Sequence, residues 1–145
     1  MSIPETSTCS PILLIEDNPL DVDLTLRAFK RCGLVNPVLV ARDGEEALAW
    51  IPRWEAGELL PVVILLDLRL PKIDGLTVLQ AFKTHPVLRR IPVVVLTTSK
   101  EDCDIQVAYD QGANSYIVKP VDFDNFMNMA RQIELYWCVL NEVSK

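Results

Sequence analysis

Two uninterrupted apolar runs constrain the fold of this chain more than any other feature. Residues 62–66 read VVILL and residues 92–96 read PVVVL. A strand with one face in water alternates apolar and polar residues, whereas a strand covered on both faces is apolar nearly throughout. Both runs therefore favour parallel strands that are buried between two layers of helices.

The rest of the sequence alternates short apolar runs with longer segments of helical periodicity. The predicted strands are 12–16, 37–41, 62–67, 91–97 and 114–119. One predicted helix begins at Pro19 and ends near Gly33, the next follows the RDG of residues 42–44, and the others cover about 75–84, 101–111 and 122–141. This order predicts an α/β domain with a doubly wound parallel sheet over residues 11–145, with a slightly extended C-terminal helix, after a flexible N-terminus of residues 1–10.

Composition and charge narrow the class of protein. The net charge is −6 and no cluster of lysines and arginines offsets it, so we expect no nucleic-acid partner. The longest apolar run, residues 59–66, is too short to cross a bilayer, and the N-terminus lacks the cationic start and apolar core of a signal peptide. The four cysteines form no metal-type cluster, which favours reduced thiols in a cytoplasmic protein.

Polar residues that could bind a ligand or take part in a reaction follow four of the five predicted strands. They are Glu16 and Asp17, Asp67, the run Thr97-Thr98-Ser99, and Lys119. In an open parallel sheet, ligands bind outside the carboxyl ends of the strands. A helix cap or a solvated loop explains each group singly, but capping does not readily explain all four at one edge of one sheet.

Such a cluster of acids needs compensating positive charge. Two carboxylates about 4 Å apart repel by roughly 4 kcal/mol at an effective dielectric constant near 20. Lys119 supplies one positive charge, and a hard divalent cation such as Mg²⁺ would supply two through oxygen ligands. One carboxylate could then act as a nucleophile toward phosphorus, while the lysine, the cation and a hydroxyl share the charge of the transferring group.

Four motifs in the same order resemble the receiver domain of two-component response regulators. They read ILLIEDN, LLDLRLPKIDGLTVL, IPVVVLTTS and GANSYIVKP, and they span about residues 12–120. The resemblance implies a flavodoxin-like (βα)5 fold with strand order 2-1-3-4-5. It also implies a phosphoprotein that signals by accepting a phosphoryl group from a histidine kinase, and not an enzyme.

The resemblance assigns a role to individual residues. Asp67 would be the phosphorylated aspartate, and Mg²⁺ (or Mn²⁺) would be held by Asp17, Asp67 and the backbone carbonyl of Arg69, with Glu16 helping, through water.

Three further residues would contact or sense the phosphoryl group. Thr97 would hydrogen-bond to it and Lys119 would pair with it. Tyr116 would move inward when Thr97 moves toward the phosphate.

The aromatic tail and the single-domain build resemble cyanobacterial response regulators that pair with phytochrome histidine kinases. We also expect a homodimer through the C-terminal helix, because an apolar stripe at helical spacing runs along it and further apolar residues leave little of its remaining face polar, and a helix that is apolar nearly all round is usually buried on more than one side. The stripe consists of Phe123, Phe126, Ala130, Ile133, Trp137 and Leu140.

Two other functions are open. A phosphohydrolase of the haloacid dehalogenase type also places an aspartate after an apolar strand, but it needs a second aspartate two residues later, where this chain has Arg69. A receiver-like binding module that no longer accepts phosphate usually lacks the aspartate, the lysine or the acidic pair, and all three are present here.

Overall fold

The structure is a computed structural model that describes residues 10–97, 102–119 and 123–135, with side chains except at residues 97 and 102–105. In this part of the chain a sheet of five parallel strands has the order β2-β1-β3-β4-β5, which confirms the predicted topology. The strands are β1 (Ile12–Ile15), β2 (Val38–Ala41), β3 (Val63–Leu66), β4 (Val93–Thr97) and β5 (Ser115–Val118).

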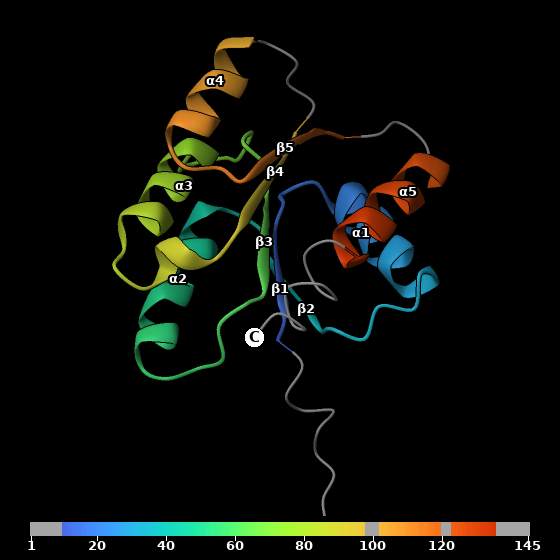
Figure 1. Cartoon of the computed structure of the whole chain (residues 1–145), viewed down its shortest axis with the longest axis horizontal. Coiled ribbons are helices and arrows are strands. Elements are labelled where there is room, and N and C mark those ends of the chain that lie inside the picture. Colours follow the sequence, from blue (N-terminus) through green and yellow to red (C-terminus); the bar gives the residue numbers. More distant parts are fainter. Residues whose placement is uncertain (1–9, 98–101, 120–122, 136–145) are drawn as a thin grey trace, which may run out of the picture.

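Helices cover both faces of the sheet (Figure 1). On one face lie α1 (Pro19–Arg31) and α5 (Phe123–Ile133), and on the other lie α2 (Gly44–Glu55), α3 (Gly75–Thr84) and α4 (Asp102–Asp110). A short 3-10 helix, η2 (Leu88–Arg90), precedes β4. This arrangement is the three-layer doubly wound architecture that the alternating sequence predicts.

The apolar runs are explained by burial on both faces of the sheet. In β1, Leu13 and Ile15 pack into the core on the α2–α3 side, whereas Ile12 and Leu14 pack into the core on the α1–α5 side. All four residues of β3 have no exposed surface. Truncating such a buried leucine or isoleucine to alanine typically costs about 2–5 kcal/mol, so the central strands hold their carboxyl ends rigidly.

Helix α1 begins immediately after the acidic pair at the end of β1. The Asn18 side chain caps it by accepting hydrogen bonds from the backbone N–H groups of Leu20 (2.9 Å) and Asp21 (3.2 Å). Pro19 is the first helical residue, where its missing N–H costs nothing. The cap therefore fixes where the first turn of α1 lies relative to the edge of the sheet.

The ends of the chain differ in part from the sequence prediction. Ser10, which the sequence analysis assigned to the N-terminal segment, is buried and its backbone carbonyl accepts a hydrogen bond from Asn36 Nδ2 (2.8 Å), so this residue packs with the fold. Three residues of the predicted dimer stripe, Phe126, Ala130 and Ile133, are buried in the chain's own core. Trp137 and Leu140 lie outside the described residues.

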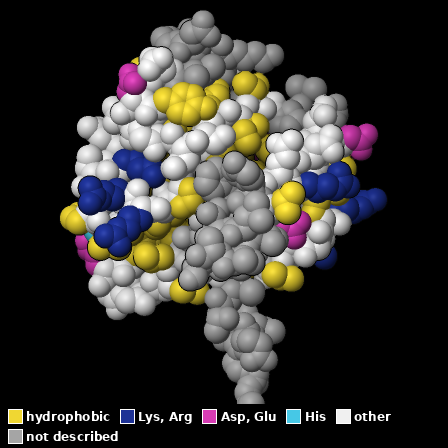
Figure 2. Space-filling view, viewed as in Figure 1, with side chains coloured by type: hydrophobic (Ala, Val, Ile, Leu, Met, Phe, Trp, Pro, Cys, Tyr) yellow, Lys and Arg dark blue, Asp and Glu magenta, His cyan; other side chains and the backbone are white. Residues whose placement is uncertain are grey.

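The described surface adds two observations. On the face shown in Figure 2, the lysine and arginine side chains fall into separate groups, so the described part of that face has no continuous basic stripe. Among the helices that the structure describes, none combines the length and the apolar character needed to cross a membrane.

Candidate functional site

The carboxyl edge of the sheet brings three predicted acids together. Glu16, Asp17 and Asp67 each place one carboxylate oxygen within 4.8 Å of those of the other two. Glu16 and Asp67 are almost fully buried, with 3% and 4% of their surface exposed, whereas Asp17 is exposed. Strands β1 and β3 are adjacent in the sheet, so the residues that follow them necessarily lie side by side.

Backbone groups hold the two buried acids in place. The backbone N–H of Asp67 donates to the carbonyl of Ile15 (3.0 Å), which continues the pairing of β3 with β1. The N–H of Arg69 donates to Asp67 Oδ1 (2.9 Å), and the N–H of Asn18 donates to Glu16 Oε2 (3.1 Å). Each acid therefore keeps a second carboxylate oxygen for another partner.

That partner is Lys119, which follows β5. Its Nζ donates to Glu16 Oε1 (2.7 Å), to Asp21 Oδ2 (2.7 Å) and to Asp67 Oδ2 (3.1 Å). The lysine side chain is only 7% exposed. An ammonium group has three N–H donors, so these three carboxylates occupy its full donor capacity.

The site is strongly negative despite the lysine. Burial raises the pKa of Glu16 to about 7; the hydrogen bond from Lys119 opposes the shift and the charge of Asp67 adds to it. Burial alone would lower the pKa of Lys119, but the carboxylates of Asp21, Glu16 and Asp67 together hold it above its usual value. Lys119 is therefore charged at neutral pH, and one lysine does not balance the surrounding acids.

This donor set fits a divalent cation. Hard cations such as Mg²⁺ prefer carboxylate and carbonyl oxygens, and the three clustered acids offer carboxylate oxygens within 4.8 Å of one another. Burial, and to a lesser extent the charge of Asp67, raise the pKa of Glu16, so a bound cation would favour the charged form of this carboxylate. The chemistry of the site thus agrees with the metal that the sequence predicts.

Asp21 is the member of the cluster that the sequence analysis missed. It lies in the first turn of α1, four residues after Asp17. An acid at that position is commonly explained by its favourable interaction with the helix dipole, so the sequence alone does not indicate a role for Asp21 in the site. The available signal was the helix start at Asn18-Pro19, which places the first turn of α1 beside the edge where Asp17 lies.

For the remaining predicted residues, Thr97, Tyr116 and Arg69, the structure gives fewer contacts. Thr97 ends β4 and pairs with Val118, one residue before Lys119, but its side chain lies outside the described part. Tyr116 pairs with Val95 and is partly buried against the core on the α2–α3 side. Arg69 contributes its backbone N–H to Asp67 and has an exposed side chain.

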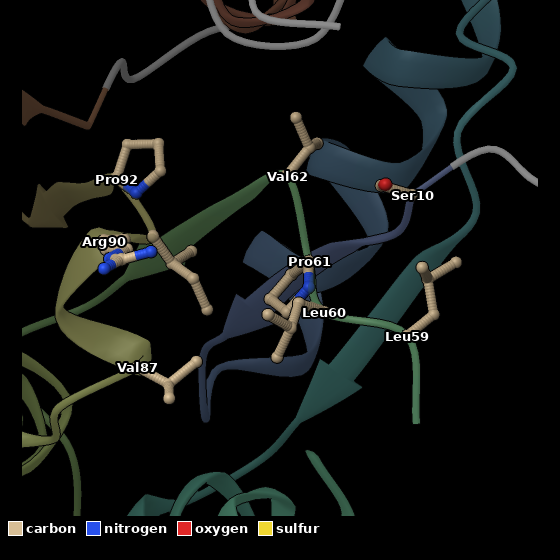
Figure 3. Close-up of a pocket in the computed structure, with 9 residues that line it drawn as sticks. Ser10, Leu59, Leu60, Pro61, Val62, Val87, Arg90 and Pro92 are labelled. Atoms are coloured by element: carbon tan, nitrogen blue, oxygen red, sulfur yellow. The ribbon is translucent and has the colours of Figure 1, made fainter. Parts of the chain in front are cut away.

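A hollow at the opposite edge of the sheet has a different character (Figure 3). It has a volume of about 460 Å³ and lies where β1, β3 and β4 begin. Its lining residues are Ser10, Leu59, Leu60, Pro61, Val62, Val87, Arg90, Ile91 and Pro92. This lining includes no carboxylate, so the hollow does not offer the chemistry found at the carboxyl edge.

Known proteins are similar to this chain in sequence over most of its length. The chain is 46% identical over 127 residues to the probable methanogenesis regulatory protein FilR2 of Methanothrix harundinacea, covering 87% of this chain and 82% of that protein. It is 37% identical over 137 residues to the response regulator Rcp1 of Synechocystis, covering 92% of each.

Solved structures agree with these relatives. The phosphorylated cyanobacterial phytochrome response regulator RcpA matches with a TM-score of 0.81 and 40% identity, over 88% of this chain and 93% of that one. The Mn²⁺-bound form of Rcp1 matches with a TM-score of 0.80 and 37% identity, over 89% and 94% of the two chains. The family model described as the response regulator receiver domain matches residues 12–131. The chain therefore belongs to the response regulator receiver domain family.

Proposed function

We propose that the chain signals by accepting a phosphoryl group on Asp67 from a histidine kinase. One observation carries the proposal: Lys119 Nζ lies 3.1 Å from Asp67 Oδ2, at the point where Asp17 and Glu16 also present carboxylate oxygens. The aspartate is thus held beside a cation and beside the acids that would bind a second one. Helix capping alone does not explain why Asp67 lies beside Lys119 and two further acids.

The transfer is a single displacement at phosphorus. A carboxylate oxygen of Asp67 forms the new P–O bond, the P–N bond of a phosphohistidine breaks, and its electron pair stays on the ring nitrogen. Lys119 stabilises the added negative charge from one side. Asp17, Asp67 and the Arg69 carbonyl, assisted by Glu16, would hold Mg²⁺ or Mn²⁺, which when bound supplies further positive charge for the phosphoryl oxygens. Each protein accepts one phosphoryl group, so it is a stoichiometric acceptor and not an enzyme.

The proposed readout of phosphorylation is a rearrangement near β4 and β5. Thr97 would move toward the phosphoryl group, and Tyr116 would turn further into the core. Support comes from the backbone, because Thr97 is the last residue of β4 and Tyr116 lies on the adjoining strand β5. The changed surface would be recognised by a protein, since the net charge of −6 disfavours nucleic acid.

Labelling by a small phosphodonor tests the acceptor assignment. With Mg²⁺, the wild type should take up phosphate from phosphoramidate, and chelation of the cation should prevent it. Asp67→Asn should abolish the label. Asp74→Asn is the matched control, because Asp74 caps α3 from an exposed position and asparagine caps equally well.

The outcomes separate the alternatives. A labelled Asp67→Asn variant would mean that the acceptor is another residue. A wild type that folds, binds Mg²⁺ and takes up no label would favour the receiver-like binding module. Steady turnover of a phosphomonoester would favour the phosphohydrolase.

A phytochrome-type histidine kinase is the proposed partner, and the cytoplasm, where such a kinase would reach the chain, is the proposed location. The similarity to RcpA over most of both chains supports this partner. A phosphotransfer screen against the histidine kinases of the same source tests it. Selective transfer from a kinase without a phytochrome sensor would contradict it.

We also propose that the chain dimerises through its C-terminal helix. Because Phe126, Ala130 and Ile133 are already buried in the chain's own core, the contact would begin beyond them, where Leu135 is 60% exposed. The single receiver domain over residues 11–145 would then be the protomer. Sedimentation at micromolar concentration should show a dimer, and a monomer both with and without phosphorylation would refute the proposal.

A further inference from the structure

Asp21 competes for the lysine that the proposed phosphoryl transfer needs. Lys119 Nζ is as close to Asp21 Oδ2 as it is to Glu16 Oε1, at 2.7 Å, and closer than it is to Asp67 Oδ2, at 3.1 Å. All three N–H donors of the ammonium are engaged by these carboxylates. A phosphoryl oxygen can therefore be bound fully only if one existing contact weakens.

The exposure of the three acids indicates which contact weakens at least cost. The side chains of Glu16 and Asp67 are 4% and 6% exposed, whereas that of Asp21 is 22% exposed. Asp67 carries the phosphoryl group itself, and Glu16 would be left as a buried, uncompensated carboxylate without the lysine, which is expensive, whereas water can solvate Asp21 when it is released. Asp21 is thus the replaceable partner of Lys119.

The negative charge of Asp21 also favours its release from Lys119 when Asp67 is phosphorylated. Phosphorylation replaces the single negative charge of Asp67 by the two charges of an acyl phosphate at neutral pH. Asp21 is a further negative charge bound to the same ammonium, so it repels the phosphoryl group and withholds part of the positive charge that would stabilise it.

We propose that Asp21 is a positioning residue that holds Lys119 in the unphosphorylated site and disfavours the phosphorylated state. This inference rests on the proposed function, because it requires Asp67 to be the acceptor. It assigns to α1 a part in setting how completely the chain is phosphorylated. Removing the charge of Asp21 should therefore strengthen the binding of a phosphoryl group.

Beryllofluoride, an inert analogue of a phosphoryl group, is the probe. Its affinity is measured by calorimetry at saturating Mg²⁺, so that changes in metal affinity do not contribute. Asp21→Asn should bind it about fivefold more tightly than the wild type, the effect expected from a partly exposed ion pair. Asp21→Glu keeps the charge and should restore the wild-type affinity.

Asp23→Asn is the matched control. Asp23 lies on the same helix, pairs with Arg27 at 3.0 Å and is 53% exposed, so the substitution changes the net charge equally without touching Lys119. It should leave the beryllofluoride affinity unchanged. The inference is overturned if Asp21→Asn matches Asp23→Asn, if it binds more weakly than the wild type, or if Asp21→Glu behaves like Asp21→Asn. A wild type that binds Mg²⁺ but no beryllofluoride would instead refute the proposed function itself.

Discussion

Replacing Gly75 with alanine tests how closely the start of α3 packs on the backbone that carries Asp67. A Cβ atom at this position would lie 2.5 Å from Leu68 Cα and 2.6 Å from the Asp67 carbonyl oxygen. Ordinary contacts of this kind are about 3.5–4.0 Å, so backbone must move by several tenths of an ångström or more. The obstacle is backbone on both sides, and no flexible side chain can turn aside.

The expected change in the free energy of unfolding has the opposite sign to that of an ordinary glycine-to-alanine substitution in a helix. Glycine to alanine in a helix usually stabilises a protein by about 1 kcal/mol, whereas forcing atoms into a packed site costs about 1–3 kcal/mol. Because the clash at Gly75 is with backbone, we expect the clash to dominate and the free energy of unfolding to fall by about 1–2 kcal/mol. The same displacement should slow Mg²⁺-dependent phosphorylation, since it moves the backbone of Asp67.

Urea unfolding followed by tryptophan fluorescence measures the change in stability. Gln80→Ala is the control, because Gln80 lies on α3 and is exposed, and its substitution should change stability by less than about 0.5 kcal/mol. A Gly75→Ala variant that is more stable than the wild type, with unchanged phosphorylation, would refute the packing argument.

Three further predictions concern the same edge of the sheet. The pKa of Glu16 is raised to about 7 in the folded chain, so the protonated carboxyl stabilises the metal-free protein at low pH. This contribution to the free energy of unfolding should be lost as pH rises from about 4.5 through 7. Glu16→Gln should remove that pH dependence, as measured by urea unfolding at a series of pH values. Asn18→Ala should lower the free energy of unfolding by about 1 kcal/mol through loss of the α1 cap, whereas Asn18→Asp should not. Lys119→Ala should keep the circular dichroism of the wild type but lose most beryllofluoride binding; retained affinity would contradict the role of the lysine.

The sequence was sufficient for the fold because its strongest signals are local. The apolar run of residues 62–66 and the Asn18-Pro19 helix start each follow from backbone and burial chemistry within a few residues. Once the strands are parallel, the residues after them must meet, which is why Glu16, Asp17, Asp67 and Lys119 could be predicted to lie together. The strand order 2-1-3-4-5 and the roles of these residues in phosphoryl transfer came from the family resemblance.

What the sequence did not predict depends on packing between distant elements. Asp21 contacts Lys119 across 98 residues of chain, and only the position of α1 against the sheet brings them together. The last helix was expected to be buried on more than one side because it is apolar nearly all round; Phe126, Ala130 and Ile133 cover the chain's own sheet, and the dimer contact stays a prediction. Periodicity shows which face of a helix is apolar, and not whether the partner is the same chain or a second copy.

Mapping the phosphorylated residue tests the account most directly. The chain is phosphorylated with a small donor and Mg²⁺, the acyl phosphate is reduced with borohydride, and peptide mass spectrometry locates the aspartate converted to homoserine. We predict conversion at Asp67 and at no other acid. Conversion at Asp17 or Asp21, or intact Asp67 in fully phosphorylated protein, would contradict the account.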